Sequence, residues 1–120
     1  MKFSEDKPIY LQIIDYVDEQ ILLGRWVSGE RIMSVRELAS ALEVNPNTVM
    51  RSYNVLTDSQ ILVNQRGIGF YVSEEAVDIV LRGRKQLFLR EDLPNFFKKM
   101  KLLGITMQDL VEIYKLTENE

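Results

Sequence analysis

The sequence predicts a mainly α-helical fold that carries one small β-hairpin. Most of the chain places apolar residues every three or four positions, in segments that begin at Ser, Thr, Asn or Pro, as capped amphipathic helices do. Residues 61–72 depart from this pattern, because two short runs of β-branched and aromatic residues flank a segment with two glycines, which is typical of a hairpin. No apolar run reaches the roughly 18 residues of a membrane-spanning helix.

The composition argues against several classes of function. The chain has 120 residues, a net charge of −3, no cysteine and no histidine. It therefore lacks a disulfide framework, a thiolate metal site, and both the commonest general base and the commonest metal ligand. No pair of carboxylates is spaced for acid/base work, and no apolar secretory signal precedes residue 8. We expect a cytoplasmic protein that is not an enzyme and uses no metal or cofactor.

A first helix is predicted to begin at Pro8 and to end before Gly24. A turn at Ser28-Gly29 then leads into a short extended piece, and we expect Trp26 to pack in the core near the helix end. The buried stripe of the helix repeats every four residues and consists of Ile9, Ile13, Val17 and Ile21.

Two further helices follow with a short turn between them. Ser34 caps the first of them, and Glu37 completes a capping box. Asn45 caps the second, and Pro46 suits its first position. Three helices with this short turn between the second and third form a helix-turn-helix. The inward residues of the pair are Val35, Leu38, Ala39 and Leu42, followed by Val49, Tyr53 and Leu56.

The hairpin is predicted to have strands at 61–63 and 70–72, joined by a turn over 64–69 that carries Arg66 at its tip. A three-helix core followed by such a hairpin is a winged helix. We therefore assign residues 1–73 to a winged helix-turn-helix DNA-binding domain.

Residues 74–120 are predicted to form a C-terminal α-helical hairpin. Ser73 caps its first helix, Pro94 breaks or kinks that helix, and Thr106 caps the last one. This segment is too short to enclose its apolar faces, so we expect it to dimerise with a second copy, or else to fold back on its own winged helix. The residues expected in the dimer contact are Val77, Val80, Leu81, Leu87, Phe88, Phe96, Phe97, Met100, Leu103 and Leu110.

The outer face of the third helix is rich in side chains that can pair with base edges or phosphates. Its residues are Asn47, Arg51, Asn54 and Asp58. Taken alone, this helix favours an ordinary solvated face, and Arg66 alone could be a loop residue without a role. Residues 1–30 are acidic and residues 31–72 are only weakly positive, so any DNA binding depends on a few placed arginines.

In combination, several segments resemble the GntR family of bacterial transcription regulators, and within it the YtrA subfamily. They cover residues 8–72 almost without a gap. The resemblance implies a winged helix with only a small dimerisation unit and no large ligand-binding domain, in a homodimer that commonly represses operons for ABC-type transporters. The segments are Pro8-Ile9-Tyr10-Leu11-Gln12-Ile13, Ser28-Gly29-Glu30-Arg31-Ile32, Ser34-Val35-Arg36-Glu37-Leu38-Ala39, Val44-Asn45-Pro46-Asn47-Thr48-Val49, Tyr53, and Arg66-Gly67-Ile68-Gly69-Phe70-Tyr71-Val72.

The resemblance also implies which residues bind DNA. They are Ser34, as a cap with a candidate phosphate contact, together with Arg36, Asn45, Asn47, Thr48, Arg66 and Gly67. Arg51 joins them as a phosphate contact from the outer face. The chain departs from the family at Ser28 and Met33, where Pro is usual, at Met50, where many relatives carry Arg, and at Gln60, where Gly is usual. A positive φ at Gln60 would cost on the order of 1 kcal/mol, so we expect the turn to be built differently.

Together these observations predict a regulator, most simply a repressor, that binds double-stranded DNA at a palindromic operator as a homodimer. The competing hypothesis is a winged-helix protein-interaction module without DNA binding, which the overall acidity favours slightly. Arginines on both the helices and the wing favour DNA binding, because a protein-binding winged helix has no need of an arginine at both places. An effector is unknown; a cleft between subunits near Phe88, Phe97 and Met100 is one place for it, and simple dimer core is the other interpretation.

Overall fold

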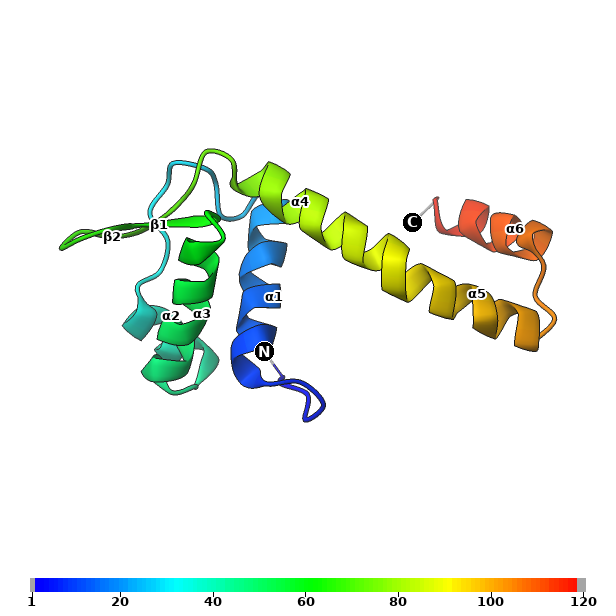
Figure 1. Cartoon of the computed structure of the whole chain (residues 1–120), viewed down its shortest axis with the longest axis horizontal. Helices are drawn as coiled ribbons and strands as arrows, with labels where there is room; N and C mark the ends of the chain where they lie inside the picture. The colour runs from blue at the N-terminus through cyan, green and yellow to red at the C-terminus, as the bar shows by residue number, and fades with distance from the viewer. Residues whose placement is uncertain (1, 119–120) are drawn as a thin grey trace. The chain divides into compact units, whose positions relative to one another are not determined.

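The computed structural model describes residues 2–118, which divide into two compact units, one ending at Arg82 and one beginning at Gly83 (Figure 1). The first unit contains α1 (Ile9–Leu22), α2 (Val35–Leu42), α3 (Pro46–Asp58), β1 (Leu62–Gln65) and β2 (Gly69–Val72). No helix within the described residues is both long and apolar enough to cross a membrane.

The core of the first unit is built around α3, which packs against both α1 and α2. Tyr53 lies at its centre with no exposed surface. Its ring meets Phe70 edge-on at a centroid distance of 4.8 Å, and its hydroxyl donates to the carbonyl oxygen of Met33 at 2.7 Å. Burial raises the pKa of Tyr53, so this hydroxyl keeps its proton and remains a donor. One side chain thus joins α3, the hairpin and the loop before α2.

The predicted starts of α2 and α3 are confirmed. The backbone N–H of Glu37 donates to Ser34 Oγ at 3.1 Å, and the N–H of Ser34 donates to Glu37 Oε1 at 3.0 Å. Asn45 Oδ1 accepts from the N–H of Asn47 at 2.8 Å, and Pro46 occupies the first turn of α3. Each cap satisfies backbone donors that the helix itself cannot pair.

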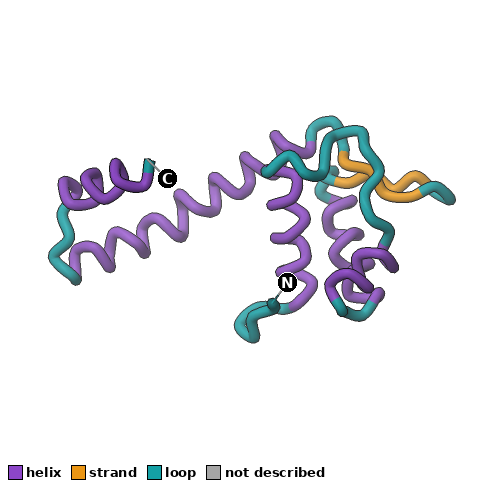
Figure 2. Tube along the Cα trace, turned by 180° about the vertical axis from the view of Figure 1, so that it is seen from behind, coloured by secondary structure: helices purple, strands orange, loops and turns teal. Residues whose placement is uncertain are grey.

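The hairpin is longer than its apolar residues predicted. Its strands are antiparallel, with Leu62 opposite Val72 and Gln65 opposite Gly69, so the turn is confined to residues 66–68 (Figure 2). Placing residues 64, 65 and 69 in the turn was therefore wrong. Cross-strand backbone bonds extend the ladder regardless of side-chain polarity. The extended piece after Gly29 joins the hairpin, since the N–H of Ile32 donates to the carbonyl oxygen of Phe70 at 2.9 Å.

The helix α4 (Ala76–Leu87) starts two residues later than a cap at Ser73 predicts. The backbone N–H of Ser73 continues the bonding of the hairpin by donating to Ile61, and its hydroxyl donates to the carbonyl oxygen of Gln60 at 2.7 Å. Ser73 therefore closes the wing instead of capping a helix. Val80, which was expected in the dimer contact, is instead 2% exposed within the core of the first unit.

The second unit holds the end of α4, a π-helical turn (Phe88–Asp92), α5 (Leu93–Leu102) and α6 (Met107–Thr117). Pro94 does not break the helix. The N–H of Leu93 reaches back five residues to the carbonyl oxygen of Phe88, so the turn widens immediately before the proline. This widening accommodates a residue that has no N–H and whose ring crowds the preceding turn. The capping box of Thr106 and Asp109 at the start of α6 is confirmed.

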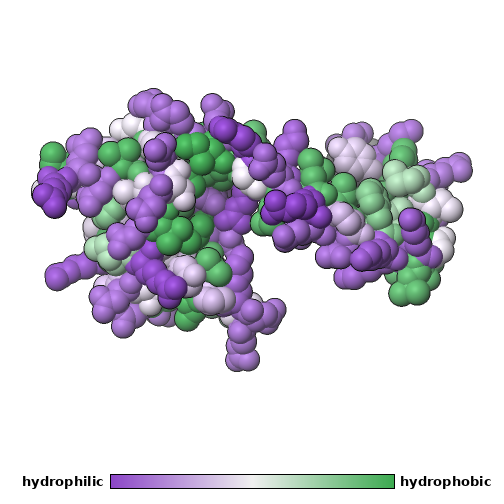
Figure 3. Space-filling view, in the orientation of Figure 1, coloured by the Kyte–Doolittle hydropathy of each residue, from purple (hydrophilic) through white to green (hydrophobic). Residues whose placement is uncertain are grey.

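Apolar side chains of the second unit remain largely exposed. Among its described residues Met100 alone is buried, so this member of the expected dimer contact is also covered within the chain. Figure 3 shows apolar atoms on the visible face of this unit. The exposed large apolar residues are Leu87, Phe88, Leu89, Phe96, Phe97, Leu102, Leu103, Ile105, Met107, Val111, Ile113, Tyr114 and Leu116.

The turn between α3 and β1 does require a positive φ. Gln60 has φ +65°, and the N–H of the following Ile61 returns to the carbonyl oxygen of Leu56 at 2.9 Å. The expectation that this turn avoids the left-handed region was wrong, because the chain must reverse within a few residues to pair the hairpin. A side chain in this conformation is strained by roughly 1 kcal/mol.

Gln60→Gly should therefore raise the free energy of unfolding by roughly 0.5–1 kcal/mol, since glycine adopts a positive φ without strain. Urea denaturation followed by circular dichroism measures this change. Ser59→Gly is the matched control, because Ser59 has φ −83° and glycine should lower the stability there. A Gln60→Gly variant less stable than the parent protein would contradict the strain argument.

Candidate nucleic-acid interface

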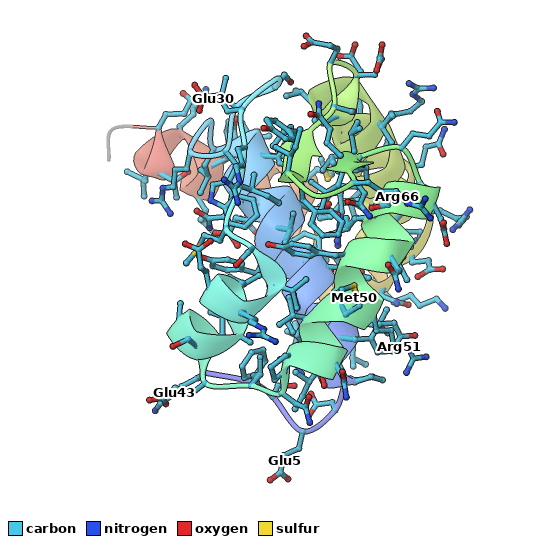
Figure 4. All side chains as sticks on the ribbon, turned by 90° about the vertical axis from the view of Figure 1, so that its left-hand side faces the viewer. Glu5, Glu30, Glu43, Met50, Arg51 and Arg66 are labelled. Carbon is cyan, nitrogen blue, oxygen red and sulfur yellow. The ribbon has the colours of Figure 1, made fainter. Side chains whose placement is uncertain are left out.

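The predicted DNA-binding residues come from three places in the first unit: the start of α2, the first half of α3 and the tip of the hairpin. All of them are at least partly exposed. In Figure 4, Arg51 and Arg66 lie toward one edge of the view, whereas Glu43 and Glu5 project at its lower edge. The basic side chains are thus separated from these acidic ones, although the net charge is −3.

The start of α3 and the start of α1 border one shallow hollow. Its lining includes four predicted residues, Asn45, Asn47, Thr48 and Arg51, together with Pro8, Ile9 and Tyr10. The amide, hydroxyl and guanidinium groups brought together here are those that pair with base edges and phosphates. The contribution of α1 to this surface was not foreseen from the sequence.

Arg51 stacks on the ring of Tyr10, with its Cζ atom 3.6 Å from the ring centroid. The next residue, Ser52, donates its hydroxyl to the carbonyl oxygen of Tyr10 at 2.7 Å, which ties α3 to α1 beneath the stack. Arg51 therefore lies on the α1 flank of the outer face, with its guanidinium held on an aromatic face. The hydrophobic periodicity of α3 does not predict this contact, because Tyr10 lies 41 positions earlier in the chain.

At the start of α2, the hydrogen bond from the backbone N–H of Ser34 holds the pKa of Glu37 below its ordinary value of 4.5. The hydroxyl of Ser34 and the charge of Arg31 act in the same direction. Within the cap, the oxygen of Ser34 accepts from the backbone N–H of Glu37 at 3.1 Å. The cap holds the first turn of α2, from which Arg36 projects into solvent.

The tip of the hairpin is a tight turn in which the N–H of Ile68 returns to the carbonyl oxygen of Gln65 at 2.9 Å. Gly67 has φ +74°, a conformation that glycine adopts freely, and Arg66 is exposed beside it. At the base of the turn, a Cβ on Gly69 would lie 2.7 Å from Arg31 Nε. Arg31 thus lies against the wing backbone, as a further basic group outside the predicted set of DNA-binding residues.

Comparisons with known proteins find relatives of this chain in sequence and in fold. The family model described as "Bacterial regulatory proteins, gntR family" matches residues 9–72. The transcriptional regulator YhcF of Bacillus subtilis is 36% identical over 111 residues, which are 92% of this chain and 90% of that protein. The transcriptional repressor YtrA of the same organism is 36% identical over 108 residues, which are 90% of this chain and 82% of that protein. The solved structure of a GntR family transcriptional regulator from Listeria monocytogenes is similar, with a TM-score of 0.78 and 34% identity. The similarity covers 94% of this chain and 97% of that one.

The lowered pKa of Glu37 predicts a pH-dependent contribution to stability. Because its folded pKa lies below the unfolded value, ionised Glu37 stabilises the protein above about pH 4.5, and this contribution is lost as the pH falls through the folded pKa. The melting temperature of the parent protein should therefore exceed that of Glu37→Gln at pH 7, and the difference should close toward pH 3. A difference that stays constant across this range would show that the charge plays no part.

The stack of Arg51 on Tyr10 predicts a measurable coupling. A double-mutant cycle of Tyr10→Leu and Arg51→Gln, read from urea unfolding, should give a coupling free energy of about 0.5–1 kcal/mol. Tyr10→Phe keeps the aromatic face, so Arg51→Gln should lower stability as much in that background as in the parent protein. If the changes in unfolding free energy caused by Tyr10→Leu and Arg51→Gln simply add in the double variant, the stack contributes nothing to stability.

Proposed function

The chain belongs to the GntR family of bacterial transcriptional regulators, and from this premise we propose that it is a repressor that binds a palindromic operator as a homodimer. The family supplies its DNA-binding helix-turn-helix and consists of regulators, not enzymes. One observation carries the proposal furthest: Tyr53 of α3 contacts both the loop before α2 and the hairpin, so the three elements that carry the proposed DNA-binding residues share one core.

In this proposal α3 enters the major groove, and the hairpin follows the adjacent backbone or minor groove. Asn47 and Thr48 contact base edges near the start of α3. The phosphate and groove contacts come from Arg36, Arg51 and Arg66. The remaining proposed site residues position these groups, namely Ser34 and Asn45 as caps and Gly67 as the turn glycine.

We assign residues 1–73 to DNA binding and residues 74–120 to dimerisation. The exposed apolar side chains of α5 and α6 support this assignment, because a helical unit of this size buries too little apolar surface by itself. Two copies joined by a two-fold axis would offer two recognition helices to a palindromic site. The contact we propose retains Val77, Leu81, Leu87, Phe88, Phe96, Phe97, Leu103 and Leu110, without the buried Val80 and Met100.

Repression is proposed on the similarity to YtrA, which is named a repressor and aligns with 90% of this chain, beyond the winged helix. An operon for an ABC-type transporter is proposed as the target on the resemblance to the YtrA subfamily alone.

Fluorescence anisotropy with the promoter of the chain's own operon tests the proposal. The labelled promoter duplex and a scrambled duplex of equal composition are titrated at several salt concentrations. Preference for the promoter together with a steep salt dependence is the expected result, because phosphate contacts release counterions. Equal and weak binding to both duplexes would count against operator recognition and would favour the protein-interaction alternative.

Arg36→Ala should weaken promoter binding and reduce the slope of log affinity against log salt by about one unit, the contribution of a single phosphate contact. Arg25→Ala removes the same charge from an exposed position outside the candidate interface and is the matched control. If both variants keep the parent slope, Arg36 does not contact a phosphate.

Sedimentation velocity should report a dimer for the parent protein. Phe88→Glu should shift it toward monomer, because the charge would enter an apolar contact. Lys99→Glu, also exposed and in the same unit, should remain dimeric. A Phe88→Glu variant that stays dimeric with an unchanged helical signal would remove Phe88 from the contact.

A further inference from the structure

The helix α3 exposes two large apolar side chains, one on each flank of its outer face. Met50 is 40% exposed and Val55 is 37% exposed. Val55 belongs to the α1 flank, since Ser52, three residues earlier, donates to the carbonyl oxygen of Tyr10. Met50 belongs to the α2 flank, since Tyr53, three residues later, reaches the carbonyl of Met33 just before α2.

Met50 is not needed for the core. The buried side of α3 is formed by Val49, Ser52, Tyr53 and Leu56. On the surface Met50 has Asn47 three residues before it and Asn54 four residues after it, so the two exposed amides are its helical neighbours. In Figure 4 Met50 lies on the part of α3 that faces the viewer, between α2 and Arg51.

The chemistry of the major groove limits what such a side chain can contact. The thioether of Met50 donates no hydrogen bond and accepts only weakly, so it cannot read the polar edge of guanine or cytosine. The groove offers one apolar group, the 5-methyl of thymine. Amide side chains, in contrast, pair with adenine through its N6 and N7 atoms. An apolar side chain between two amides matches a thymine next to an adenine.

We propose that Met50 packs against the 5-methyl group of a thymine in each half-site of the operator and is a specificity-determining residue. This inference rests on the proposed function and extends it, because it names a base and a position on α3. The unbranched, polarisable side chain adapts to a methyl group without fixed geometry. Val55, on the α1 flank, makes no such contact and serves as the internal reference.

The test uses two versions of the promoter duplex, one with thymine and one prepared with deoxyuridine at every thymine position. Uracil keeps all hydrogen-bonding groups and lacks only the 5-methyl. Anisotropy at fixed salt gives the ratio of the two affinities for each protein variant. Met50→Gln retains similar length and helix propensity, and Val55→Gln is the matched control on the other flank.

The parent protein should bind the thymine duplex more tightly, and its preference should exceed that of Met50→Gln by about ten- to twentyfold, the combined effect expected for one buried methyl group in each of the two half-sites. Met50→Gln should keep the salt slope of the parent protein, because no phosphate contact is lost. Val55→Gln should keep the full preference for thymine. Replacing one thymine at a time by deoxyuridine, in a half-site mapped by footprinting, would then identify the thymine whose methyl group Met50 contacts.

Two results would overturn the inference while leaving the regulator intact. One is equal binding of the two duplexes by the parent protein, and the other is a Met50→Gln variant whose preference for thymine is undiminished. If the parent protein does not distinguish its promoter from a scrambled duplex, the proposed function fails and the assignment of Met50 fails with it. Thermal melts of both variants verify that these comparisons are made between folded proteins.

Discussion

The winged helix depends on one buried aromatic residue. The ring of Tyr53 packs against Phe70 of the hairpin, while its hydroxyl satisfies the carbonyl of Met33 before α2. Since the side chain is wholly enclosed, losing the hydroxyl would leave a backbone acceptor without its donor in an apolar setting. One polar contact and one aromatic pair at the centre of the core thus link α3, the loop before α2 and the hairpin.

Local signals in the sequence were sufficient wherever the responsible atoms lie within a few residues of each other. The capping boxes at Ser34 and Thr106 and the Asn-Pro start of α3 are such cases, because the side chain and the backbone group that it satisfies belong to the same turn. These local signals gave wrong predictions where a residue's hydrogen-bond partner lies in a distant segment of the chain. Ser73 has the residue type and position of a helix cap, yet its hydroxyl donates to Gln60, thirteen residues earlier.

The candidate interface was predictable as a set of residue types but not as an arrangement. The amides and arginines of α2, α3 and the wing could be assigned from helical period and family resemblance. The support of Arg51 by Tyr10 and the position of Arg31 against Gly69 could not, because each joins residues more than thirty positions apart. Such contacts depend on how the helices and the hairpin pack, which hydrophobic period alone does not determine.

The π-helical turn at Phe88–Asp92 has a consequence for comparing this chain with its relatives. A π turn holds one residue more than an α turn, so it is what a single inserted residue leaves within a continuous helix. A relative with an unbroken α-helix here would need a one-residue gap between residues 88 and 92 in the alignment. Without that gap, every position of α5 and α6 would be matched to a neighbour about 100° around the helix, and apolar surfaces would be compared with polar ones.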